Sequence, residues 1–559
     1  FNYAASIPGA PAKLKMEILM QQPNSFSMTM KMMGMTVQRQ FSNGNTGFND
    51  GMQGASEMTS DELLKSQNEF KIAFENDEII TIDKVGEAIN KAHVVDFFGT
   101  FSQRKFHVGK NRMGEANVNF NIVMKPECAH IELNDDQSSG FPKTSPRANN
   151  SPQELMITIE KDSQYVLQTY GRFPLALAKG QGTRVWDEDG REYLDFCAGI
   201  ATCSLGHCHP ALTSAITEQA NQLMHCSNLY FTKQQSDLAE LIVEKVVQQP
   251  GKIFFSNSGA EANDGLIKLA RRHGVESGRH EIITFNQSFH GRTIGAMSAT
   301  AQGNIHDGFG PLFPGFVYSL LNDLEAVEAA ITEKTTAFLV EPIQGEGGVK
   351  VATKEFLEGL ATLAEKHDIL LLLDEVQCGM GRTGTLNGWE TIAPGLKPDG
   401  ISWAKGMGGG FPIGSFWVAE KHVPLLGPGS HGSTYGGNAL ASAASAAVIK
   451  TIIEDDLVSN VNAREAQIRK TISEWNHPAI TEIRGAGLIL GIGIDTSQLS
   501  IPDDAVPSIH LCKKLIKLGL LVPPAGPDTL RLLPPLNVTA DEVSQALALF
   551  KQVLDAHQA

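Results

Sequence analysis

The sequence of 559 residues lacks a long apolar run, paired cysteines and an excess of basic residues, and each absence excludes a class of protein. It has no apolar run near the ~20 residues that a membrane-spanning helix needs. Its seven cysteines are odd in number and show no paired spacing, which argues against a disulfide framework. We therefore expect a reducing compartment, the cytoplasm, and no membrane partner. The net charge of −16 argues against nucleic acid as a main partner.

The first 150 residues differ in composition from the rest. They hold eleven of the 16 methionines, and the alternation over Ser27–Met32 predicts a half-buried strand. Strands are also expected near Val118–Met124 and Lys105–Val108, and a helix over Thr59–Gln67. Such a methionine stripe favours an adaptable core over a ligand site. We predict a β-rich N-terminal module over residues 1–133 without a recognisable chemical site.

A segment rich in Ser, Asn and Pro over residues 134–152 reads as a linker. Two interpretations of the module before it stay open: a separate interaction or carrier module, or an artefact of joining two reading frames. The chain begins at Phe1, which leaves open a targeting segment upstream.

Strand and helix patterns alternate after the linker, which predicts an α/β fold with a mostly parallel sheet flanked by helices. We expect a large domain over residues 211–455. Residues 153–210 and 456–559 should form the N-terminal and C-terminal parts of a smaller α+β domain. The Cys and His cluster within Cys203–Pro210 has no second ligand pair at matched spacing, so no metal site is predicted.

The organising stretch is the apolar run Ile369–Leu373, which predicts a strand buried on both faces. Asp374 follows at its carboxyl end, where open α/β sheets bind ligands. A second short strand, Ile401–Ala404, leads into Lys405 and a run of glycines. The lysine suits a Schiff base with an anionic aldehyde cofactor, and the acid suits its ring nitrogen. The alternative is a buried Asp–Lys ion pair.

Two other turns suit such a cofactor. Gly259 and Ala260 follow a predicted strand and open a helix, whose free N–H groups would seat a phosphate. Phe289 can stack on a planar ring, and Arg292 can clamp a substrate carboxylate. The alternatives are a plain strand–helix turn and a packed surface turn.

Taken together, these residues resemble the class III pyridoxal-phosphate aminotransferases over about residues 155–559, and within that class most resemble the acetylornithine branch. The motifs that carry the resemblance are Tyr170–Pro174, Ser204–Pro210, Asn257–Asn263, Ser288–Arg292, Glu341–Glu346, Leu373–Gly384 and Arg531–Pro535. The departures are Cys203, where the family often has asparagine, and the bulky pair Phe416–Trp417.

The resemblance implies pyridoxal 5′-phosphate as the cofactor and the fold of type I transferases that depend on it. Lys405 and Asp374 would be catalytic: Lys405 would hold the cofactor and shuttle a proton, and Asp374 would pair with the ring nitrogen. Further implied cofactor-binding residues are Gly259, Ala260, Phe289, Gln377 beside the ring hydroxyl, and Thr434 from the neighbouring subunit of a homodimer. Implied substrate-binding residues are Arg292, Ser433, Glu346 and Arg531.

The implied reaction is ping-pong transamination of N2-acetyl-L-ornithine with 2-oxoglutarate, which gives N-acetylglutamate 5-semialdehyde and L-glutamate in arginine biosynthesis. Glu346 would pair with Arg531 in one half-reaction and release it in the other. The alternatives are a fixed Glu346–Arg531 pair, another class III aminotransferase acting on succinylornithine, ornithine, 4-aminobutyrate or a diamine, and a non-catalytic binding protein on the same scaffold.

Overall fold

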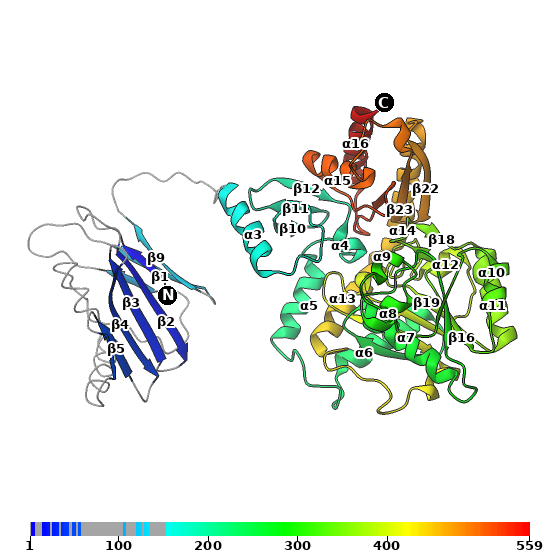
Figure 1. The fold of residues 1–559 in the computed structure, drawn as a ribbon, viewed down its shortest axis with the longest axis horizontal. Helices are drawn as coiled ribbons and strands as arrows, with labels where there is room; N and C mark the ends of the chain where they lie inside the picture. The colour runs from blue at the N-terminus through cyan, green and yellow to red at the C-terminus, as the bar shows by residue number, and fades with distance from the viewer. Residues whose placement is uncertain are drawn as a thin grey trace, which may run out of the picture. The chain divides into compact units, whose positions relative to one another are not determined.

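The computed structural model describes nine short strands before residue 135 and the chain from residue 152 to 558, with side chains from Thr158 onward (Figure 1). The chain divides into two compact units, Phe1–Ser145 and Pro146–Ala559. Each unit is described by itself. Among the described residues, no helix has both the length and the apolar character needed to cross a bilayer.

The first unit contains two antiparallel sheets. Six strands pair in chain order, and three later strands form the second sheet. Their bounds are β1 (Asn2–Ala5), β2 (Leu14–Gln22), β3 (Ser25–Met32), β4 (Met35–Asn43), β5 (Gly47–Gly51), β6 (Gly54–Glu57), β7 (Arg104–His107), β8 (Asn119–Lys125) and β9 (Cys128–Asn134). The helix predicted over Thr59–Gln67 and residues 135–151 of the expected linker lie outside the described residues.

A seven-stranded sheet organises the second unit. Its order is β13 (Gly251–Ser256), β21 (Gly414–Ala419), β20 (Gly400–Trp403), β19 (Leu370–Asp374), β16 (Thr335–Val340), β14 (Glu281–Phe285) and β15 (Phe316–Ser319). Only β21 runs antiparallel to its neighbours within this sheet. The predicted α/β fold with a mostly parallel sheet is therefore confirmed.

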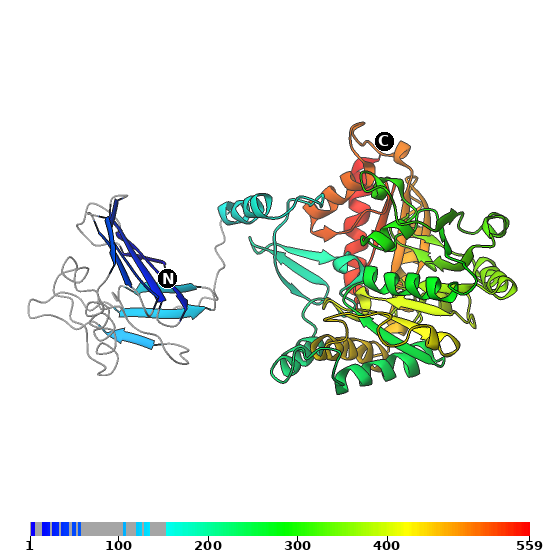
Figure 2. The same cartoon turned by 60° about the horizontal axis from the view of Figure 1, so that its bottom comes forward.

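Helices cover both faces of this sheet (Figure 2). Leu370 and Leu372 of β19 pack in a cluster with helix α7 (Gly259–His273). The alternate residues Leu371 and Leu373 pack in a larger cluster that includes α11 (Lys354–His367) and α13 (Ala439–Glu454). Burial on both faces explains why β19 reads as an unbroken leucine run.

Smaller sheets flank the central one. The first contains β10 (Leu177–Gln181), β11 (Arg184–Asp187), β12 (Glu192–Asp195) and β24 (Leu520–Leu521); the second contains β22 (Ile480–Ala486), β23 (Ile489–Ile494) and β25 (Thr529–Leu532); β17 (Ile343–Gln344) pairs with β18 (Lys350–Val351). The parallel pairing of β12 with β24 joins the start of this unit to its C-terminal part. The exact domain boundaries stay a prediction.

The remaining helical elements connect these sheets. They are α3 (Pro152–Tyr165), α4 (Ala198–Ala201), α5 (Pro210–Ala220), α6 (Lys233–Leu241), η1 (Ile242–Val247), α8 (Ile294–Ala299), α9 (Gly303–His306), α10 (Leu324–Ala330), α12 (Gly388–Ile392), η2 (Lys405–Met407), η3 (Glu420–Leu425), α14 (Leu457–Trp475), η4 (Thr496–Gln498), α15 (Pro507–Leu518) and α16 (Ala540–His557).

The bulky residue Phe416 on β21 is accommodated by a glycine on α7. A Cβ atom placed on Gly265 would lie 2.2 Å from Phe416 Cε1, well inside van der Waals contact. Phe416 itself is 1% exposed, so its ring has little room to move. The absence of a side chain at position 265 therefore sets how closely α7 approaches the sheet.

We predict that Gly265→Ala destabilises the protein. Overpacking costs about 1–3 kcal/mol, and the better helix preference of alanine offsets about 1 kcal/mol of it. Adding Phe416→Leu should recover part of the loss. Thermal and denaturant unfolding measure both effects, with Gly303→Ala as the control because a Cβ there meets nothing within 4 Å. An unchanged midpoint for Gly265→Ala would contradict the packing argument.

Candidate active site

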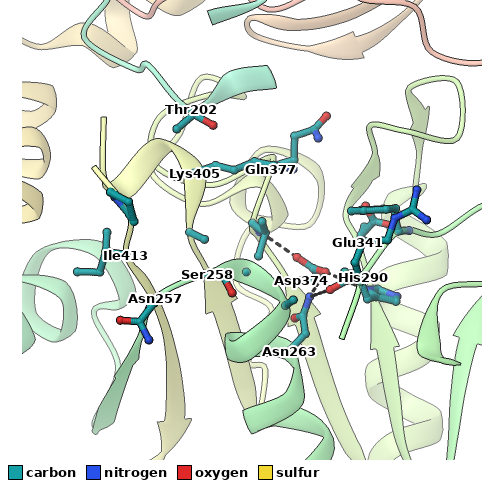
Figure 3. Close-up of a pocket in the computed structure, with 18 of the residues that line it drawn as sticks. Thr202, Asn257, Ser258, Asn263, His290, Glu341, Asp374, Gln377, Lys405 and Ile413 are labelled. Atoms are coloured by element: carbon teal, nitrogen blue, oxygen red, sulfur yellow. Dashed lines mark hydrogen bonds and ion pairs between the residues drawn. The ribbon is translucent and has the colours of Figure 1, made fainter. Parts of the chain in front are cut away.

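A cavity of about 450 Å³ opens at the carboxyl edge of the central sheet (Figure 3). Strands β13, β14, β16, β19 and β20 all end there, because parallel strands deliver their carboxyl ends to one edge. The cavity is lined by Thr202, Asn257, Ser258, Gly259, Ala260, Asn263, Phe289, His290, Gly291, Arg292, Glu341, Asp374, Val376, Gln377, Ala404, Lys405, Gly410, Phe411, Pro412 and Ile413.

Asp374 lies at the base of the cavity in a buried hydrogen-bond network. Its Oδ2 accepts from Asn263 Nδ2 at 2.7 Å and contacts His290 Nδ1 at 2.7 Å. Its Oδ1 accepts the backbone N–H of Val376 at 2.9 Å. The carboxylate is 2% exposed, and these three contacts fix its orientation.

Lys405 reaches the same cavity from the end of β20. Its backbone adopts φ +42°, a left-handed conformation that costs a non-glycine residue about 1–2 kcal/mol. Burial lowers the pKa of its amine, although Glu346 acts in the opposite direction. Asp374 pairs with His290. The structure thus brings the predicted acid and lysine together on one cavity.

The first turn of α7 forms another wall. Ser258 caps the helix by accepting the N–H of Glu261, and the N–H groups of Gly259 and Ala260 have no partner within the helix. A Cβ atom on Gly259 would lie 2.7 Å from Val376 Cγ1, so only glycine fits beside that wall. This turn is a ready seat for an anion.

Phe289 and Arg292 line the cavity from the turn after β14, with the guanidinium 5.8 Å from the ring centroid. Arg531 and Glu346 do not line it but form an ion pair beside it at 2.8 Å. Gln377 joins the two: its Oε1 accepts from Arg531 Nη1 at 2.8 Å, and its Nε2 donates to Glu346 at 3.3 Å.

The Glu346–Arg531 pair is asymmetric in its burial. The Arg531 side chain is 1% exposed, whereas that of Glu346 is 30% exposed. Burial opposes ionisation of Glu346, but the charge and hydrogen bond of Arg531 outweigh it, and the pKa of Glu346 is lowered. Arg531 is thus the fixed partner, and Glu346 is the one with room to move.

Ser433 and Thr434 do not line this cavity within the single chain. The Ser433 hydroxyl accepts the Gly436 N–H of its own loop at 2.9 Å, and it accepts from Nδ2 of the cavity-lining residue Asn257 at 3.2 Å. Thr434 lies in a small separate hollow with Asn228 and Tyr230. The predicted binding roles of both residues stay predictions.

The Cys and His cluster near residue 207 has a structural arrangement. His207 Nε2 lies 2.7 Å from Asp195 Oδ2, and the His207 backbone pairs with Gly182. Within the part of the chain described with side chains, no group of three His, Cys, Asp or Glu residues is placed to hold a metal.

Sequence reasoning missed Asn263 and Glu341 as site residues. Asn263 links Asp374 to Ser402, whose hydroxyl donates to Asn263 Oδ1 at 2.6 Å. The sequence did offer a clue to Asn263, because it is a polar residue on the apolar face of a predicted helix. Glu341 accepts the N–H of Phe289 at 3.0 Å and is 5% exposed. Its signal was its position at the end of a buried strand.

The family model of class-III aminotransferases matches residues 165–554, well over half of the chain. The chain belongs to the class-III aminotransferase family. It is therefore an aminotransferase, and enzymes of this family use pyridoxal 5′-phosphate as their cofactor. The match leaves residues 1–164 outside the family region.

Similar proteins cover the same region. The acetylornithine aminotransferase of Caldanaerobacter subterraneus is 46% identical over 404 residues, which span 71% of this chain and 99% of that protein. The acetylornithine aminotransferase of Synechocystis is 43% identical, over 72% of this chain and 94% of the relative.

Solved structures agree in fold. Ornithine aminotransferase from Toxoplasma gondii, crystallised with partial occupancy of pyridoxal phosphate, matches with a TM-score of 0.68 and 31% identity, over 72% of this chain and 94% of that chain. N-acetylornithine aminotransferase from Stenotrophomonas maltophilia matches with a TM-score of 0.60 and 35% identity, over 71% of this chain and 98% of that chain.

A second buried carboxyl group, Glu375, supports the segment behind the cavity. It accepts the backbone N–H groups of Gly388 and Trp389 at 2.7 and 2.8 Å. Burial raises its pKa from 4.5 to about 7, although these two hydrogen bonds act against the rise. The folded protein therefore binds this proton more tightly than the unfolded chain does.

We predict that Glu375 stabilises the fold at acidic pH and that this contribution is lost as pH rises through about 7. The free energy of unfolding of the wild type minus that of Glu375→Gln should fall by about 3 kcal/mol between pH 4.5 and 7. A constant offset is also expected, because the amide NH2 group of glutamine cannot accept a hydrogen bond from a backbone N–H. Unfolding curves across this range test the slope; a flat difference would contradict it.

Proposed function

We propose that this chain catalyses the transamination of N2-acetyl-L-ornithine with 2-oxoglutarate, a step of arginine biosynthesis. The observation that carries the proposal is the convergence of Asp374 and Lys405 on one cavity, beside a buried arginine that is paired with the partly exposed Glu346. The curated relatives named acetylornithine aminotransferase, at 42–46% identity, support the choice of substrate.

The cavity fits pyridoxal phosphate. Its base carries the Asp374 carboxyl group in a fixed orientation, its side has a helix start with free N–H groups, and Phe289 and Val376 add a flat ring and an apolar side chain to its lining. When bound, the cofactor supplies an electron sink for the carbon that loses or gains the amine. Asp374 would hold the ring nitrogen, and Gly259 and Ala260 would bind the phosphate.

Lys405 Nζ would anchor the cofactor and then move a proton to and from the reacting carbon. Its lowered pKa suits this role, because an uncharged amine is needed to accept the proton. Gln377 would lie beside the ring hydroxyl, and the exposed Arg292 would bind the distal carboxylate of the amino acid.

One site must serve two substrates in a ping-pong cycle. Glutamate carries a carboxylate on its reacting carbon, but the terminal carbon of acetylornithine does not. A free Arg531 would be an unpaired buried charge beside acetylornithine, so Glu346 would neutralise it there and release it to glutamate. Gln377 would keep its hydrogen bond to Arg531 in both states.

We predict that Glu346→Ala slows the acetylornithine half-reaction by about tenfold or more and the glutamate half-reaction by less than about threefold. Glu346→Gln, which keeps the shape without the charge, should show the same order of effects. Stopped-flow half-reactions followed at the cofactor absorbance measure each. Equal losses in both half-reactions would mean a fixed ion pair.

A second candidate is an ornithine aminotransferase. The Toxoplasma gondii enzyme, named for ornithine, has a higher TM-score than the Stenotrophomonas maltophilia enzyme, 0.68 against 0.60. The same half-reaction assay separates the candidates when the pyridoxal form is mixed with acetylornithine, ornithine, succinylornithine and 4-aminobutyrate. Acetylornithine should react fastest; a faster reaction with ornithine would replace the primary proposal.

We also propose a cytoplasmic homodimer with shared active sites. Six cysteines among the residues with described side chains are free, which favours a reducing compartment. Leu229, Tyr230, Phe231 and Tyr435 are each at least 61% exposed. Asn228 hydrogen-bonds Ser433 O and Gly436 O, so these side chains share one surface with Thr434. A second copy would cover this surface and receive Thr434 at its phosphate seat.

A complementation experiment tests the shared site. Lys405→Ala and Thr434→Asp should each be nearly inactive, but refolding the two variants together should restore activity. One intact site then forms from Lys405 of one chain and Thr434 of the other, which yields about a quarter of wild-type activity for random pairing. Failure of two inactive, folded and dimeric variants to complement would place Thr434 in the site of its own chain, and full activity of Thr434→Asp alone would place it outside both sites.

A further inference from the structure

Two carboxyl groups stand side by side at the base of the cavity. Val340 pairs with Leu373 across the parallel strands β16 and β19, so the next residues, Glu341 and Asp374, occupy adjacent strand ends. They are 5% and 2% exposed, and both line the cavity. Two buried neighbouring carboxylates cannot both ionise cheaply, so their environments decide which one keeps the charge.

The hydrogen bonds around the two groups are unequal. Asp374 accepts hydrogen bonds from Asn263 Nδ2 and the Val376 N–H, and it contacts His290 Nδ1 as a third partner. Glu341 accepts a single hydrogen bond, from Phe289 N to its Oε2 at 3.0 Å. The better solvated carboxylate keeps the negative charge, and the other carries the proton.

The charged groups around Glu341 support this assignment. Burial, followed by the negative charge of Asp374, raises the pKa of Glu341 well above its ordinary value. The Phe289 N–H and the positive charge of Lys405 lower it, and Glu346 raises it. The positive charge of Arg531 is already paired with Glu346. His290 faces Asp374.

We propose that Glu341 is a neutral carboxylic acid in the working enzyme and donates a hydrogen bond into the cavity. Glu341 lies near Asp374 and His290 at the cavity (Figure 3). Its Oε2 accepts the Phe289 N–H, which would leave Oε1 and its proton for the group bound beside Asp374. This proposal rests on the proposed function, since that group is the ring of pyridoxal phosphate. Glu341 is then a cofactor-binding residue that also positions the Phe289 backbone.

Charge explains why a neutral acid is useful here. The cofactor brings a phosphate, and the substrates bring carboxylates, into a cavity whose base already holds the charge of Asp374. A second carboxylate would repel these anions, whereas a neutral acid adds a donor without adding charge. The proton stays on Glu341 throughout, so no proton transfer is assigned to it.

Three variants separate charge from hydrogen bonding. Glu341→Gln keeps a neutral donor, Glu341→Leu keeps most of the volume without a donor, and Glu341→Asp shortens the acid. The full-length holoenzyme is dialysed, and the rate of pyridoxal phosphate loss is followed by absorbance. We expect Glu341→Gln to lose cofactor within about threefold of the wild-type rate, and Glu341→Leu about tenfold faster.

Infrared spectroscopy reads the proton directly. Burial raises the pKa of Glu375 to about 7, so spectra are compared above that pH, where the proposal expects Glu341 to supply a protonated carboxyl band. The difference between wild type and Glu341→Gln should contain that band, and the difference between wild type and Glu375→Gln should not. The absence of the band, or cofactor loss from Glu341→Leu at the wild-type rate, overturns the proposal.

Neither measurement uses an amine substrate. A protein that shows the band and retains cofactor but does not react with acetylornithine would refute the proposed substrate and leave the role of Glu341 standing. A protein that reacts with acetylornithine without the band would refute only the role of Glu341. A chain that binds no pyridoxal phosphate would refute both.

Discussion

The shared direction of six strands is the constraint on which the site depends. Because parallel strands end at one edge of the sheet, the strand direction alone places residues from distant parts of the sequence at a single cavity. Asp374 ends β19, Lys405 follows β20, and Gly259 follows β13. The helices on both faces bury the sheet and keep these strand ends in register.

Strand positions were predictable because the signal is local. The leucine run of β19 and the apolar face of α11 follow directly from residue patterns, and the motifs after each strand identified Asp374, Lys405 and Phe289 as neighbours. The antiparallel direction of β21 was not predictable. It depends on which strands pair, and the sequence near Gly414 does not specify a partner.

Residues that act through register were harder to predict. Glu341 lies beside Asp374 only because Val340 pairs with Leu373. Asn263 reaches Asp374 and Ser402 only because α7 packs over β19 and β20. Thr434 is the opposite case, a residue that was named in advance but does not line the cavity of its own chain. The family resemblance implied a cofactor contact, yet within one chain Thr434 lies in a separate hollow, so the proposed role would require a second subunit. The first unit offered strands but no chemical pattern.

The central claim is that Lys405 and Asp374 hold the two ends of one pyridoxal phosphate molecule. Reduction of the holoenzyme with borohydride, followed by mass mapping of its peptides, tests it most directly. The account predicts that the phosphopyridoxyl group is attached to Lys405 alone and that Asp374→Ala weakens its retention before reduction. Attachment to a different lysine, or no covalent attachment at all, would contradict the account.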